Sequence, residues 1–286
     1  MKELAVVIVN FNAGEALEET LSSLAPGLEG FDWEAVVVDN ASNDGSERHA
    51  ERAGDRVALR RMGANAGFAR GVNAGIAASS APLVLILNPD CRLVPGAVKA
   101  LTDVLAAHAD AAIVGPRILN ADGTLQESAR GDPTLLTGLF GRTSRLSRWF
   151  PDLAIVKRNL AAERAVAAGL PSVPVDWVSG AAMLARREAL AAVGGFDEGY
   201  FLYWEDADLC RRLRDAGWLT RYVPAATVVH HVGQSSRHAR ALAIEAFHDS
   251  AYRYYVTHVI PQRWHPGRLL ARAVLSLRCT IKQTVR

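Results

Sequence analysis

Short apolar runs alternate with segments of helical spacing along the first 120 residues. The runs are rich in leucine and β-branched residues and end in polar turns, which is typical of buried strands. They cover residues 4–9, 35–38, 57–59 and 83–87. Between them, Leu17, Leu21 and Leu24 share one helical face, and Pro95 suits the first turn of another helix. This alternation predicts an α/β fold with a parallel sheet that helices cover on both faces.

Small polar residues follow three of these apolar runs. In a sheet of this type, ligands bind beyond the carboxyl ends of the strands. We therefore expect these residues to face one cleft. They are Asn10, Phe11 and Asn12 after the first run, Asp39, Asn40, Ala41 and Ser42 after the second, and Asn88, Pro89 and Asp90 after the fourth.

A glycine-rich segment follows the third run. It contains Asn65, and glycines at positions 63, 67, 71 and 75 repeat every four residues. Gly67 stands at an expected helix start and is the candidate for close approach of an anion. Close helix packing explains Gly71 and Gly75 equally well.

The pattern changes in the second half of the chain. Asn120 to Gly123 predicts a hairpin turn. Residues 131–174 carry Pro, Gly, Ser and Arg with weak periodicity, so we interpret them as a variable loop or lid. Order resumes at 175–180, followed by a strand through Leu184 and a helix that begins near Trp204.

Charge is distributed unevenly along the chain. The 286 residues are half hydrophobic, enough for one sizeable core, and their net charge is only +2. Residues 237–286, however, contain nine Arg or Lys and only two acidic residues, Glu245 and Asp249. A basic, partly aromatic tail suits an anionic membrane, a nucleic acid, or a solvated or dimer-forming helix. Of these partners, we do not expect nucleic acid.

The cysteines and the apolar segments indicate a compartment. Cys91, Cys210 and Cys279 are far apart and form no C-x-x-C pair, so neither a zinc site nor a disulfide framework is expected. The sequence shows no apolar signal core, and no uncharged apolar stretch approaches the roughly 18 residues that span a bilayer. We therefore expect a cytoplasmic protein.

Carboxylates at two places are candidates for chemistry. Asp90 sits in a turn directly after a buried strand, where it can hold Mg²⁺ or Mn²⁺ beside phosphates. Alone, Asn-Pro-Asp is also an ordinary turn. Glu205, Asp206 and Asp208 cluster at an expected helix N-terminus, for which helix capping and pairing with nearby arginines is the alternative explanation.

Two neighbouring features favour a functional interpretation. The aromatic run 200–204 precedes the second carboxylate cluster, and a carboxylate beside apolar groups is more easily tuned as a base. His230 follows a β-branched strand. A single histidine is usually structural, but a neutral imidazole is able to complete a metal site begun by Asp90.

In their order and spacing, these motifs resemble glycosyltransferase family 2 over roughly residues 4–236. Within that family, the chain is most similar to bacterial rhamnosyltransferases that build cell-wall or O-antigen polysaccharide on lipid-linked acceptors. The resemblance rests on Asn10-Phe11-Asn12, Asp39, Asn65-x-Gly67-Phe68, Asn88-Pro89-Asp90, Trp204-Glu205-Asp206-x-Asp208-Leu209 and His230-x-x-Gly233-x-Ser235.

This resemblance implies a domain organisation. We expect a single GT-A domain, a Rossmann-like nucleotide-sugar-binding α/β fold, over 1–236, with 131–174 as its variable loop or lid. Residues 237–286 form a basic, mainly helical C-terminal extension.

It also implies roles for individual residues. Asp206 is expected to be the catalytic base, and Glu205 to bind acceptor hydroxyls. Asp90 is the carboxylate that remains of a D-x-D metal motif, and His230 is expected to complete the site for Mg²⁺ or Mn²⁺. The residues expected to contact the nucleotide sugar are Asn10, Phe11, Asn12, Asp39, Asn65, Gly67, Arg70, Asn88, Ser179 and Gly180.

The implied reaction is inverting sugar transfer from a nucleoside diphosphate. L-rhamnose from dTDP-rhamnose is the leading expectation, with a hydroxyl of a saccharide or polyprenyl-diphosphate-linked saccharide as acceptor. Transfer from a UDP-hexose or UDP-galactofuranose is an alternative, and a non-catalytic nucleotide-sugar-binding module is an alternative of another class. Nucleotidyltransferases and dinucleotide oxidoreductases are disfavoured, because no G-x-G-x-x-G follows the first strand and no P-loop is present.

A lipid-linked acceptor would bring the protein to a membrane. We expect residues 250–286 to contact an anionic bilayer, with the protein peripheral on the inner face of the plasma membrane. A homodimer is the alternative use of this tail.

Overall fold

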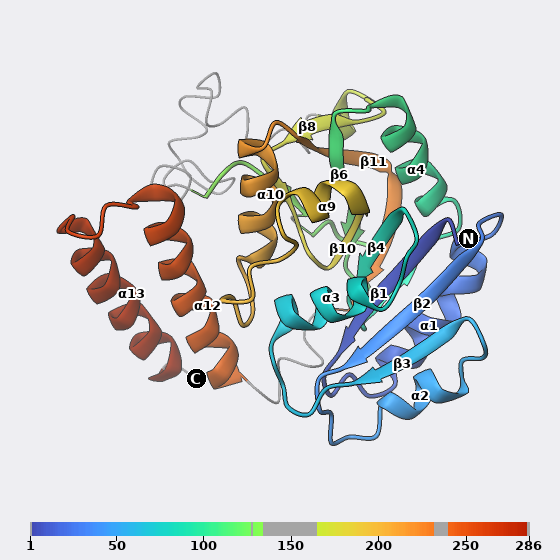
Figure 1. Cartoon of the computed structure of the whole chain (residues 1–286), viewed down its shortest axis with the longest axis horizontal. Helices are drawn as coiled ribbons and strands as arrows, with labels where there is room; N and C mark the ends of the chain where they lie inside the picture. Colours follow the sequence, from blue (N-terminus) through green and yellow to red (C-terminus); the bar gives the residue numbers. More distant parts are fainter. Residues whose placement is uncertain (1, 127, 134–164, 232–239, 285–286) are drawn as a thin grey trace.

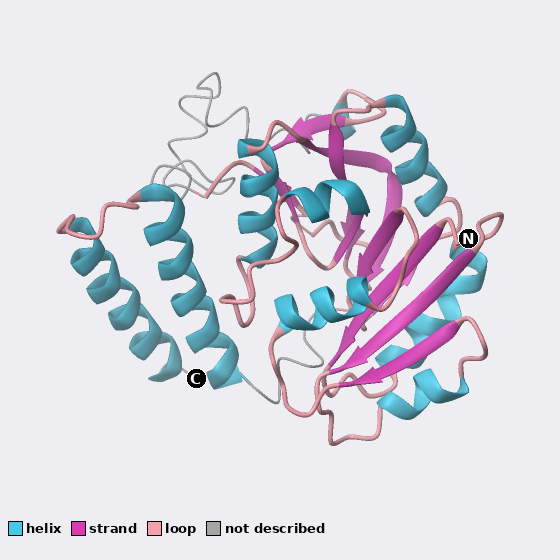
Figure 2. Ribbon diagram, viewed as in Figure 1, coloured by secondary structure: helices cyan, strands magenta, loops and turns pink. Residues whose placement is uncertain are grey.

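A single mixed sheet forms the centre of the molecule. The computed structural model describes residues 2–126, 128–133, 165–231 and 240–284, and within them nine strands join in this sheet (Figure 2). The strands are β1 (Leu4–Asn10), β2 (Trp33–Asp39), β3 (Val57–Arg61), β4 (Leu83–Leu87), β5 (Cys91–Leu93), β6 (Ala111–Leu119), β8 (Val173–Val175), β10 (Ala182–Arg186) and β11 (Leu219–His230). Their order is β3-β2-β1-β4-β10-β6-β11-β5, with β8 paired to β11. A separate two-stranded ribbon pairs β7 (Ala129–Arg130) with β9 (Trp177–Val178).

Helices cover both faces of the sheet, as the alternating pattern predicts (Figure 1). The helices of the described residues are α1 (Ala16–Gly27), α2 (Glu47–Arg52), α3 (Phe68–Ala77), α4 (Ala97–Ala107), α9 (Arg187–Ala192), α10 (Glu205–Asp215), α12 (Arg240–Tyr254) and α13 (Gly267–Thr284), with a π-helical turn, η1 (Tyr255–Val259), after α12. Side chains of α1 and α4 pack with Val6 and Ile8 on one face. Side chains of α3, α9 and α10 pack with Val7 and Ile86 on the other face. The predicted α/β fold is confirmed.

The sheet differs from the expectation in one respect, because it is not wholly parallel. β1 to β4 are parallel, but β10 runs antiparallel between β4 and β6. The chain enters β10 at Ala181, whose carbonyl accepts a 2.8 Å hydrogen bond from the backbone N–H of Asn88, just past the end of β4. The start of β10 therefore lies at the carboxyl edge of the sheet, where ligands are expected.

Close packing explains two of the regularly spaced glycines. A Cβ atom on Gly71 would lie 2.7 Å from the side chain of Val9, and one on Gly75 would lie 2.4 Å from that of Val7. Both distances are too short for any side chain, so α3 approaches β1 closely only because these positions lack one. The packing interpretation of Gly71 and Gly75 is confirmed.

The predicted hairpin after β6 is also present. The backbone N–H of Asn120 donates to the carbonyl of Thr124 at 2.8 Å, and Leu119 pairs with Leu125. Gly123 has a φ of +81°, which a glycine adopts without strain. Most of the expected lid, residues 134–164, lies outside the described residues.

The C-terminal helices form a hairpin beside α10 (Figure 1). Tyr254, the last residue of α12, is almost fully buried against Tyr200 and against Ala207, which lies in α10. α13 packs on α12 and exposes its other side. None of the helices in the described part of the chain combines the length and apolar character that crossing a bilayer demands.

Candidate active site

A buried polar network joins the ends of β1 and β2. Nδ2 of Asn10 lies 2.8 Å from Oδ1 of Asp39, 2.9 Å from Oγ of Ser46 and 3.1 Å from Oγ of Ser42. The Ser42 hydroxyl donates to Oδ1 of Asp39 at 2.6 Å, and its backbone N–H donates to Oδ2 at 3.1 Å. Asn10 and Asp39 are both buried. Their polar atoms therefore fix the shape of the two loops.

Phe11 and Asn12 are the more accessible residues of the first motif. Asn12 adopts a left-handed backbone with φ of +51°, and its Oδ1 accepts a 2.8 Å hydrogen bond from the backbone N–H of Asn43. Its own N–H donates to Oγ of Ser42 at 3.0 Å. This geometry leaves Phe11 and Asn12 half-buried at the rim of the loop, where a nucleotide can reach them.

Asn40 organises the glycine-rich segment, a role that the sequence did not suggest. Its Nδ2 donates to the carbonyl of Gly67 at 3.0 Å, and its Oδ1 accepts from the N–H of Ala66 at 3.3 Å. Asn65 caps the same turn, because its Oδ1 accepts from the N–H of Gly67 at 3.1 Å. The buried Asn40 side chain thus ties the end of β2 to the start of α3.

Gly67 brings this segment against the loop before α10. Its φ is +87°, and a Cβ atom there would lie 2.4 Å from the carbonyl oxygen of Phe201. The next residue, Phe68, donates its N–H to that carbonyl at 2.8 Å. Close approach of two backbones, which only glycine allows, therefore explains Gly67 in this structure. Arg70 is half-exposed, with Nε 3.4 Å from a carboxylate oxygen of Glu198.

Asp90, which is buried, and His230, which is half-buried, form a pair at the end of the sheet. Nε2 of His230 lies 3.1 Å from Oδ1 of Asp90 and 3.4 Å from Nδ2 of Asn88. Oδ1 of Asp90 is buried and has no hydrogen-bond partner. A buried carboxylate oxygen without a partner is costly unless a cation or proton lies beside it. These donor atoms, carboxylate oxygen and imidazole nitrogen, fit a divalent metal ion.

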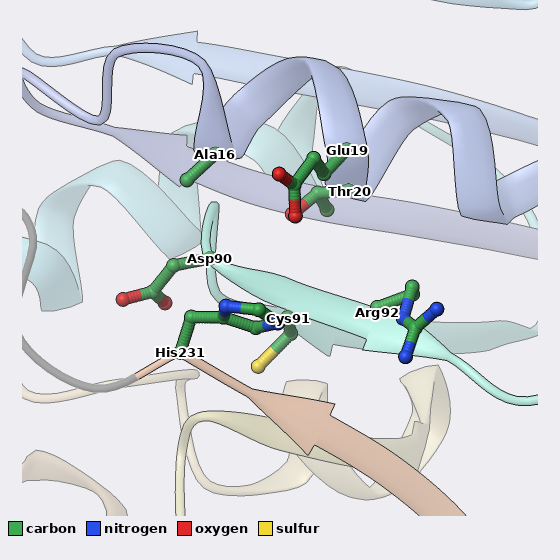
Figure 3. A pocket seen from close by; sticks show the side chains of 7 residues that line it. All are labelled: Ala16, Glu19, Thr20, Asp90, Cys91, Arg92 and His231. Carbon is green, nitrogen blue, oxygen red and sulfur yellow. The ribbon is translucent and has the colours of Figure 1, made fainter. Parts of the chain in front are cut away.

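Two hydrogen bonds hold the backbone around Asp90 in place. Thr20 donates its hydroxyl to the carbonyl of Pro89 at 2.8 Å, and the N–H of His231 donates to the carbonyl of Asp90 at 2.9 Å. Asp90, Thr20, Glu19 and His231 line a shallow recess between α1 and β5 (Figure 3).

Cys91 lies next to the pair without joining its chemistry. Its sulfur is close enough to Asp90 and His230 to share an ion with them. Burial and the neighbouring Asp90 raise the pKa of the Cys91 thiol well above its usual value. Its Sγ–H donates to the carbonyl of Ala181 at 3.3 Å. Mg²⁺ and Mn²⁺ prefer oxygen and nitrogen donors to sulfur, so the donors that suit these ions are Asp90 and His230.

The segment Ser179–Gly180–Ala181 connects this pair to the second carboxylate cluster. The N–H of Gly180 donates to Oδ2 of Asp206 at 2.9 Å. One residue later, the carbonyl of Ala181 accepts from the N–H of Asn88 and from Cys91. The segment thus contacts Asp206 through Gly180 and contacts the residues that flank Asp90 through Ala181, although 116 positions separate Asp90 from Asp206 in the sequence.

The loop before α10 has an unusual backbone. Tyr203 and Trp204 both adopt left-handed conformations, with φ of +67° and +69°. Two consecutive non-glycine residues of this kind store strain, which persists at functional sites when the surroundings enforce it. Glu205 and Asp206 follow immediately as the first residues of α10. The strained pair therefore leads directly into the two carboxylates at the start of α10.

Glu205 and Asp206 occupy different environments. Glu205 is buried, and its Oε2 has no hydrogen-bond partner. Burial and the adjacent Asp206 raise the pKa of Glu205 well above its usual range. Asp206 is half-buried, and its oxygens accept hydrogen bonds from the N–H groups of Gly180 and Ala207. Burial raises the pKa of Asp206, against these hydrogen bonds and the charge of Arg130. A carboxylate with a raised pKa is suited to accept a proton.

Asp208 serves the structure of this region. It is almost fully buried, and its carboxylate lies 2.7 Å from both Nε of Arg212 and Nε2 of His258. The hydroxyl of Tyr200 also donates to it, at 3.3 Å. Burial opposes ionisation, but the contacts with His258 and Arg212 lower the pKa of Asp208 below its usual value. Asp208 thus ties α10 to the C-terminal region.

α12 braces the loop before α10. Ser250 donates its hydroxyl to the carbonyl of Leu202 at 2.9 Å, and Arg253 binds Asp197 through two nitrogens. The ring of Trp204 packs against the rings of Tyr254 and Phe247, with 5.4 and 5.7 Å between the ring centroids. The basic extension that begins at 237 therefore supplies part of the wall around the catalytic segment.

Several of these residues were not found from the sequence. Gln126 and Arg130 belonged to no motif, and Asn40 was expected only to face the cleft after Asp39, without its role at the glycine-rich segment. Gln126 contacts His230 through both its side-chain atoms. His258 lies in the tail, which the charge pattern presented only as a basic surface. Sequence spacing gives no signal for such contacts, because they depend on which segments meet in the fold.

This edge carries an aspartate–histidine pair whose donor atoms fit a divalent cation, and the 179–181 segment links it to a pair of carboxylates. The arrangement suits the removal of a sugar from a nucleoside diphosphate. The protein is a glycosyltransferase with a GT-A fold. It belongs to glycosyl transferase family 2, whose model matches residues 5–161. A second model, glycosyl transferase family group 2, matches residues 140–282. The predicted family and enzyme class are confirmed.

Individual relatives agree with this assignment. The chain is 35% identical to an N-acetylglucosaminyl-diphospho-decaprenol L-rhamnosyltransferase of Mycobacterium tuberculosis, over 99% of this chain and 95% of the relative. It is 24% identical to the dTDP-rhamnosyl transferase RfbF of Shigella flexneri, over 87% and 75%. Among solved structures, it resembles the mannosyltransferase PcManGT of Pyrobaculum calidifontis in complex with GDP-Man and Mn²⁺. That TM-score is 0.60 at 17% identity, covering 99% of this chain and 72% of the other.

Proposed function

We propose that this enzyme transfers L-rhamnose from dTDP-rhamnose to a hydroxyl of a saccharide carried on a polyprenyl diphosphate. The sugar and the lipid-linked acceptor are supported by the name of the M. tuberculosis relative, which aligns over nearly the whole chain. The thymidine nucleotide is supported by the name of the S. flexneri relative. The observation that carries the catalytic part is the link from Asp90 to Asp206 through the 179–181 segment.

The reaction is a single in-line displacement. Asp206 accepts the proton of the acceptor hydroxyl, and that oxygen forms a bond to the anomeric carbon from the face opposite the nucleotide. The bond between the anomeric carbon and the diphosphate oxygen breaks, and its electron pair leaves with dTDP. The configuration inverts because there is one displacement. Glu205, whose pKa is raised by burial, binds an acceptor hydroxyl.

Asp90 and His230 hold Mg²⁺ or Mn²⁺ in this proposal. The unpartnered Oδ1 of Asp90 beside Nε2 of His230 supports the assignment, and the PcManGT structure contains Mn²⁺. An ion held by Asp90 and His230 would neutralise charge on the departing diphosphate. Asn88 lies beside His230 as an amide that brings no second charge.

The remaining predicted residues form the donor site. Phe11 and Asn12 border the base and ribose from the accessible rim. The buried residues Asn10 and Asp39 hold that rim in shape, and Asp39 is close enough to the surface to contribute to base recognition. The other members of the donor site are Asn65, Gly67, Arg70, Asn88, Ser179 and Gly180.

The donor proposal is tested by measuring turnover of a matched panel of nucleotide sugars with a polyprenyl-diphosphate N-acetylglucosamine acceptor. We expect dTDP-rhamnose to be used at least about tenfold faster than UDP-glucose, UDP-galactose or UDP-galactofuranose. Faster use of a UDP sugar would overturn the assignment of dTDP-rhamnose as the donor. Metal-dependent binding of nucleotides with no turnover of any donor would favour the non-catalytic alternative.

The base is tested with Asp206→Asn. This substitution keeps the shape and the contact with Gly180 but removes the proton acceptor, so kcat should fall by about 10²- to 10⁴-fold with little change in donor binding. Asp215→Asn, at the exposed end of the same helix, is the matched control and should turn over like the wild type. Near-wild-type turnover by Asp206→Asn would remove Asp206 from the mechanism.

We further propose that α13 rests on an anionic bilayer, which places the enzyme on the inner face of the plasma membrane. The helix turns its less exposed side, with Ala271, Leu275 and Cys279, toward α12. Its apolar residues face outward instead of toward the protein, and these are Leu269, Leu270, Val274, Leu277 and Ile281. A helix of this kind is stable in water only when something covers its apolar side.

Charge favours a lipid surface over a second copy of the chain. Residues 250–286 contain seven Arg or Lys and no Asp or Glu, so two such segments would repel each other. Trp264, in the turn before α13, is 97% exposed, and tryptophan prefers the interface between water and lipid. Arg253 contacts Asp197 and Tyr254 contacts Asp132, so both residues face the rest of the protein. The surface proposed for the membrane is therefore limited to about residues 264–284.

Sedimentation with lipid vesicles tests this surface. The full-length enzyme should bind phosphatidylglycerol vesicles and should not bind neutral phosphatidylcholine vesicles. Changing both Leu270 and Leu277 to Gln should weaken binding at least about tenfold, since each buried leucine contributes about 1.5–3 kcal/mol. Leu170→Gln, at an exposed leucine elsewhere, is the control. Unchanged binding by the double variant, or a dimer in solution that the double variant abolishes, would overturn the proposal.

A further inference from the structure

Gln126 stands between the 120–124 hairpin and the imidazole of His230. We propose that Gln126 is a positioning residue for the metal site, because it holds the proton of His230 on Nδ1 and so presents the lone pair of Nε2 to the ion. This inference rests on the proposed assignment of Asp90 and His230 as metal ligands. It assigns a function to a residue that lies in none of the sequence motifs.

The orientation of the Gln126 amide is determined by its neighbours. Its Nε2 lies 2.9 Å from the backbone carbonyl oxygen of His230 and 2.7 Å from Oδ1 of Asn120. A carbonyl oxygen only accepts hydrogen bonds, so the Gln126 atom that faces it must be the NH₂ group. The reversed amide would place its oxygen against the oxygen of His230 and is excluded.

The hairpin fixes the orientation of Asn120 in the same way. The carboxylate of Asp122 accepts the hydroxyl proton of Thr124 at 2.6 Å. The Thr124 oxygen then has only lone pairs to offer to Asn120, whose Nδ2 donates to it at 2.7 Å. Oδ1 of Asn120 is left to accept from Gln126. A directed chain of hydrogen bonds therefore runs from Gln126 through Asn120 and Thr124 to Asp122.

The other polar atom of the Gln126 amide, Oε1, determines which nitrogen of His230 carries the proton. Oε1 of Gln126 lies 2.9 Å from Nδ1 of His230, and this oxygen can only accept. Nδ1 must therefore carry a hydrogen. In a neutral imidazole, the lone pair is then on Nε2.

That lone pair points toward the site of the proposed ion. Nε2 lies 3.1 Å from Oδ1 of Asp90, a buried oxygen that has no hydrogen-bond partner. Two lone-pair atoms this close repel each other unless a cation or a proton lies beside both, and a bound metal ion would supply the cation. Hydrogen bonding at the second nitrogen of a histidine ligand also makes the ligating nitrogen more basic and fixes the ring. Gln126 thus prepares His230 for a metal ion before the ion arrives.

Binding of Mn²⁺ to the full-length enzyme in the presence of dTDP tests this inference without any turnover. The free ion is measured by its electron paramagnetic resonance signal. Gln126→Leu, which removes the acceptor for Nδ1–H, should weaken Mn²⁺ binding by about 10- to 100-fold. Gln126→Glu keeps an acceptor at that place and should stay within about threefold of the wild type, although it loses both donated hydrogen bonds.

Asn120→Ala is the matched control for damage to the hairpin. It removes one contact of Gln126 but leaves both contacts with His230, so Mn²⁺ affinity should stay close to that of the wild type. Gln126→Leu with wild-type affinity would overturn the inference, and so would an equal loss in Gln126→Leu and Gln126→Glu. Failure of the metal proposal gives a different result, in which the wild type and Asp90→Ala bind Mn²⁺ equally weakly.

Discussion

Nε2 of His258 lies 2.7 Å from Oδ1 of Asp208, two residues after the proposed base. This contact joins the π-helical turn that follows α12 to the helix that begins with Glu205 and Asp206. π-helical turns are rare and often occur at functional sites. The C-terminal region is therefore part of the framework that positions the catalytic carboxylates.

Removing this contact should lower the stability of the enzyme. In His258→Ala, the buried Asp208 keeps Arg212 but loses one partner, so the free energy of unfolding should fall by about 1–3 kcal/mol in urea denaturation. His258→Gln retains a side-chain donor and should recover part of this loss. If the alanine and glutamine variants were equally unstable, the hydrogen bond would not be the cause.

The contacts of Asp208 predict that the stability of the enzyme depends on pH. Despite burial, the contacts of Asp208 with His258 and Arg212 hold its pKa below the usual value. A carboxyl whose pKa is lowered by folding stabilises the protein above its unfolded pKa of about 3.9. That stabilisation disappears as the pH falls through the lower pKa of the folded state. The difference in unfolding free energy between the wild type and Asp208→Asn should therefore narrow below about pH 4, and a constant difference from pH 6 to pH 3 would contradict this.

Glu205 should behave in the opposite way. Burial and Asp206 raise its pKa in the folded state, so above about pH 4.3 the unfolded chain releases a proton that the folded chain retains. Stability then decreases as the pH rises toward the folded pKa. Glu205→Gln avoids this cost and should be more stable than the wild type by at least about 1 kcal/mol at pH 7.5, but similar to it at pH 4. Thermal unfolding at the two pH values checks both parts, and a gain that is equal at both would rule out the titration.

Gly67→Ala should disturb the catalytic loop from the nucleotide side. The new Cβ would lie 2.4 Å from the carbonyl of Phe201, at a residue whose φ is +87°. We expect a loss of about 2–4 kcal/mol in the free energy of unfolding, together with a lower kcat, because the loop before α10 must move. Gly63→Ala is the control, since nothing lies within 4 Å of its added Cβ. Equal effects of the two substitutions would show that the contact with Phe201 is unimportant.

Asn40→Ala should affect the donor more than the chemistry. The substitution releases the 65–67 turn from the end of β2 but leaves the base and the metal ligands untouched. The KM for the nucleotide sugar should rise about tenfold while kcat changes less than about threefold. Asn43→Ala changes an exposed neighbour and serves as the control. A fall in kcat at unchanged KM would place Asn40 with the catalytic loop instead.

The sequence predicted much of the sheet and the order of the candidate residues. Residues 4–9 and 83–87 are apolar runs bounded by polar residues, a local pattern that is typical of buried strands, and Asp90 lies in the turn after the second of them. Position relative to a strand end is local information, which a sequence contains. The predicted roles of Asp90, Asp206 and the donor-site residues remain predictions, although the structure places them along one edge.

The contacts between distant segments could not be predicted in this way. Gln126 reaches His230 because β6 and β11 pair in one particular register, which no local pattern specifies. Tyr254 and His258 belong to a segment whose composition indicated a basic surface, yet both rings face the catalytic half of the molecule. The antiparallel direction of β10 also depends on where the preceding loop delivers the chain.

The position of β10 has a consequence for how the molecule is made. β1 to β4 can pair as soon as the first 87 residues have left the ribosome, but β6 reaches them only through β10, which ends at Arg186. Until then, one edge of β4 has no neighbour, and an open strand edge is a place for wrong pairing. Nearly two thirds of the chain must therefore be synthesised before β10 can join β4 to β6 and complete the sheet. Asp90 and Asp206 come to the same edge of the sheet only after that step.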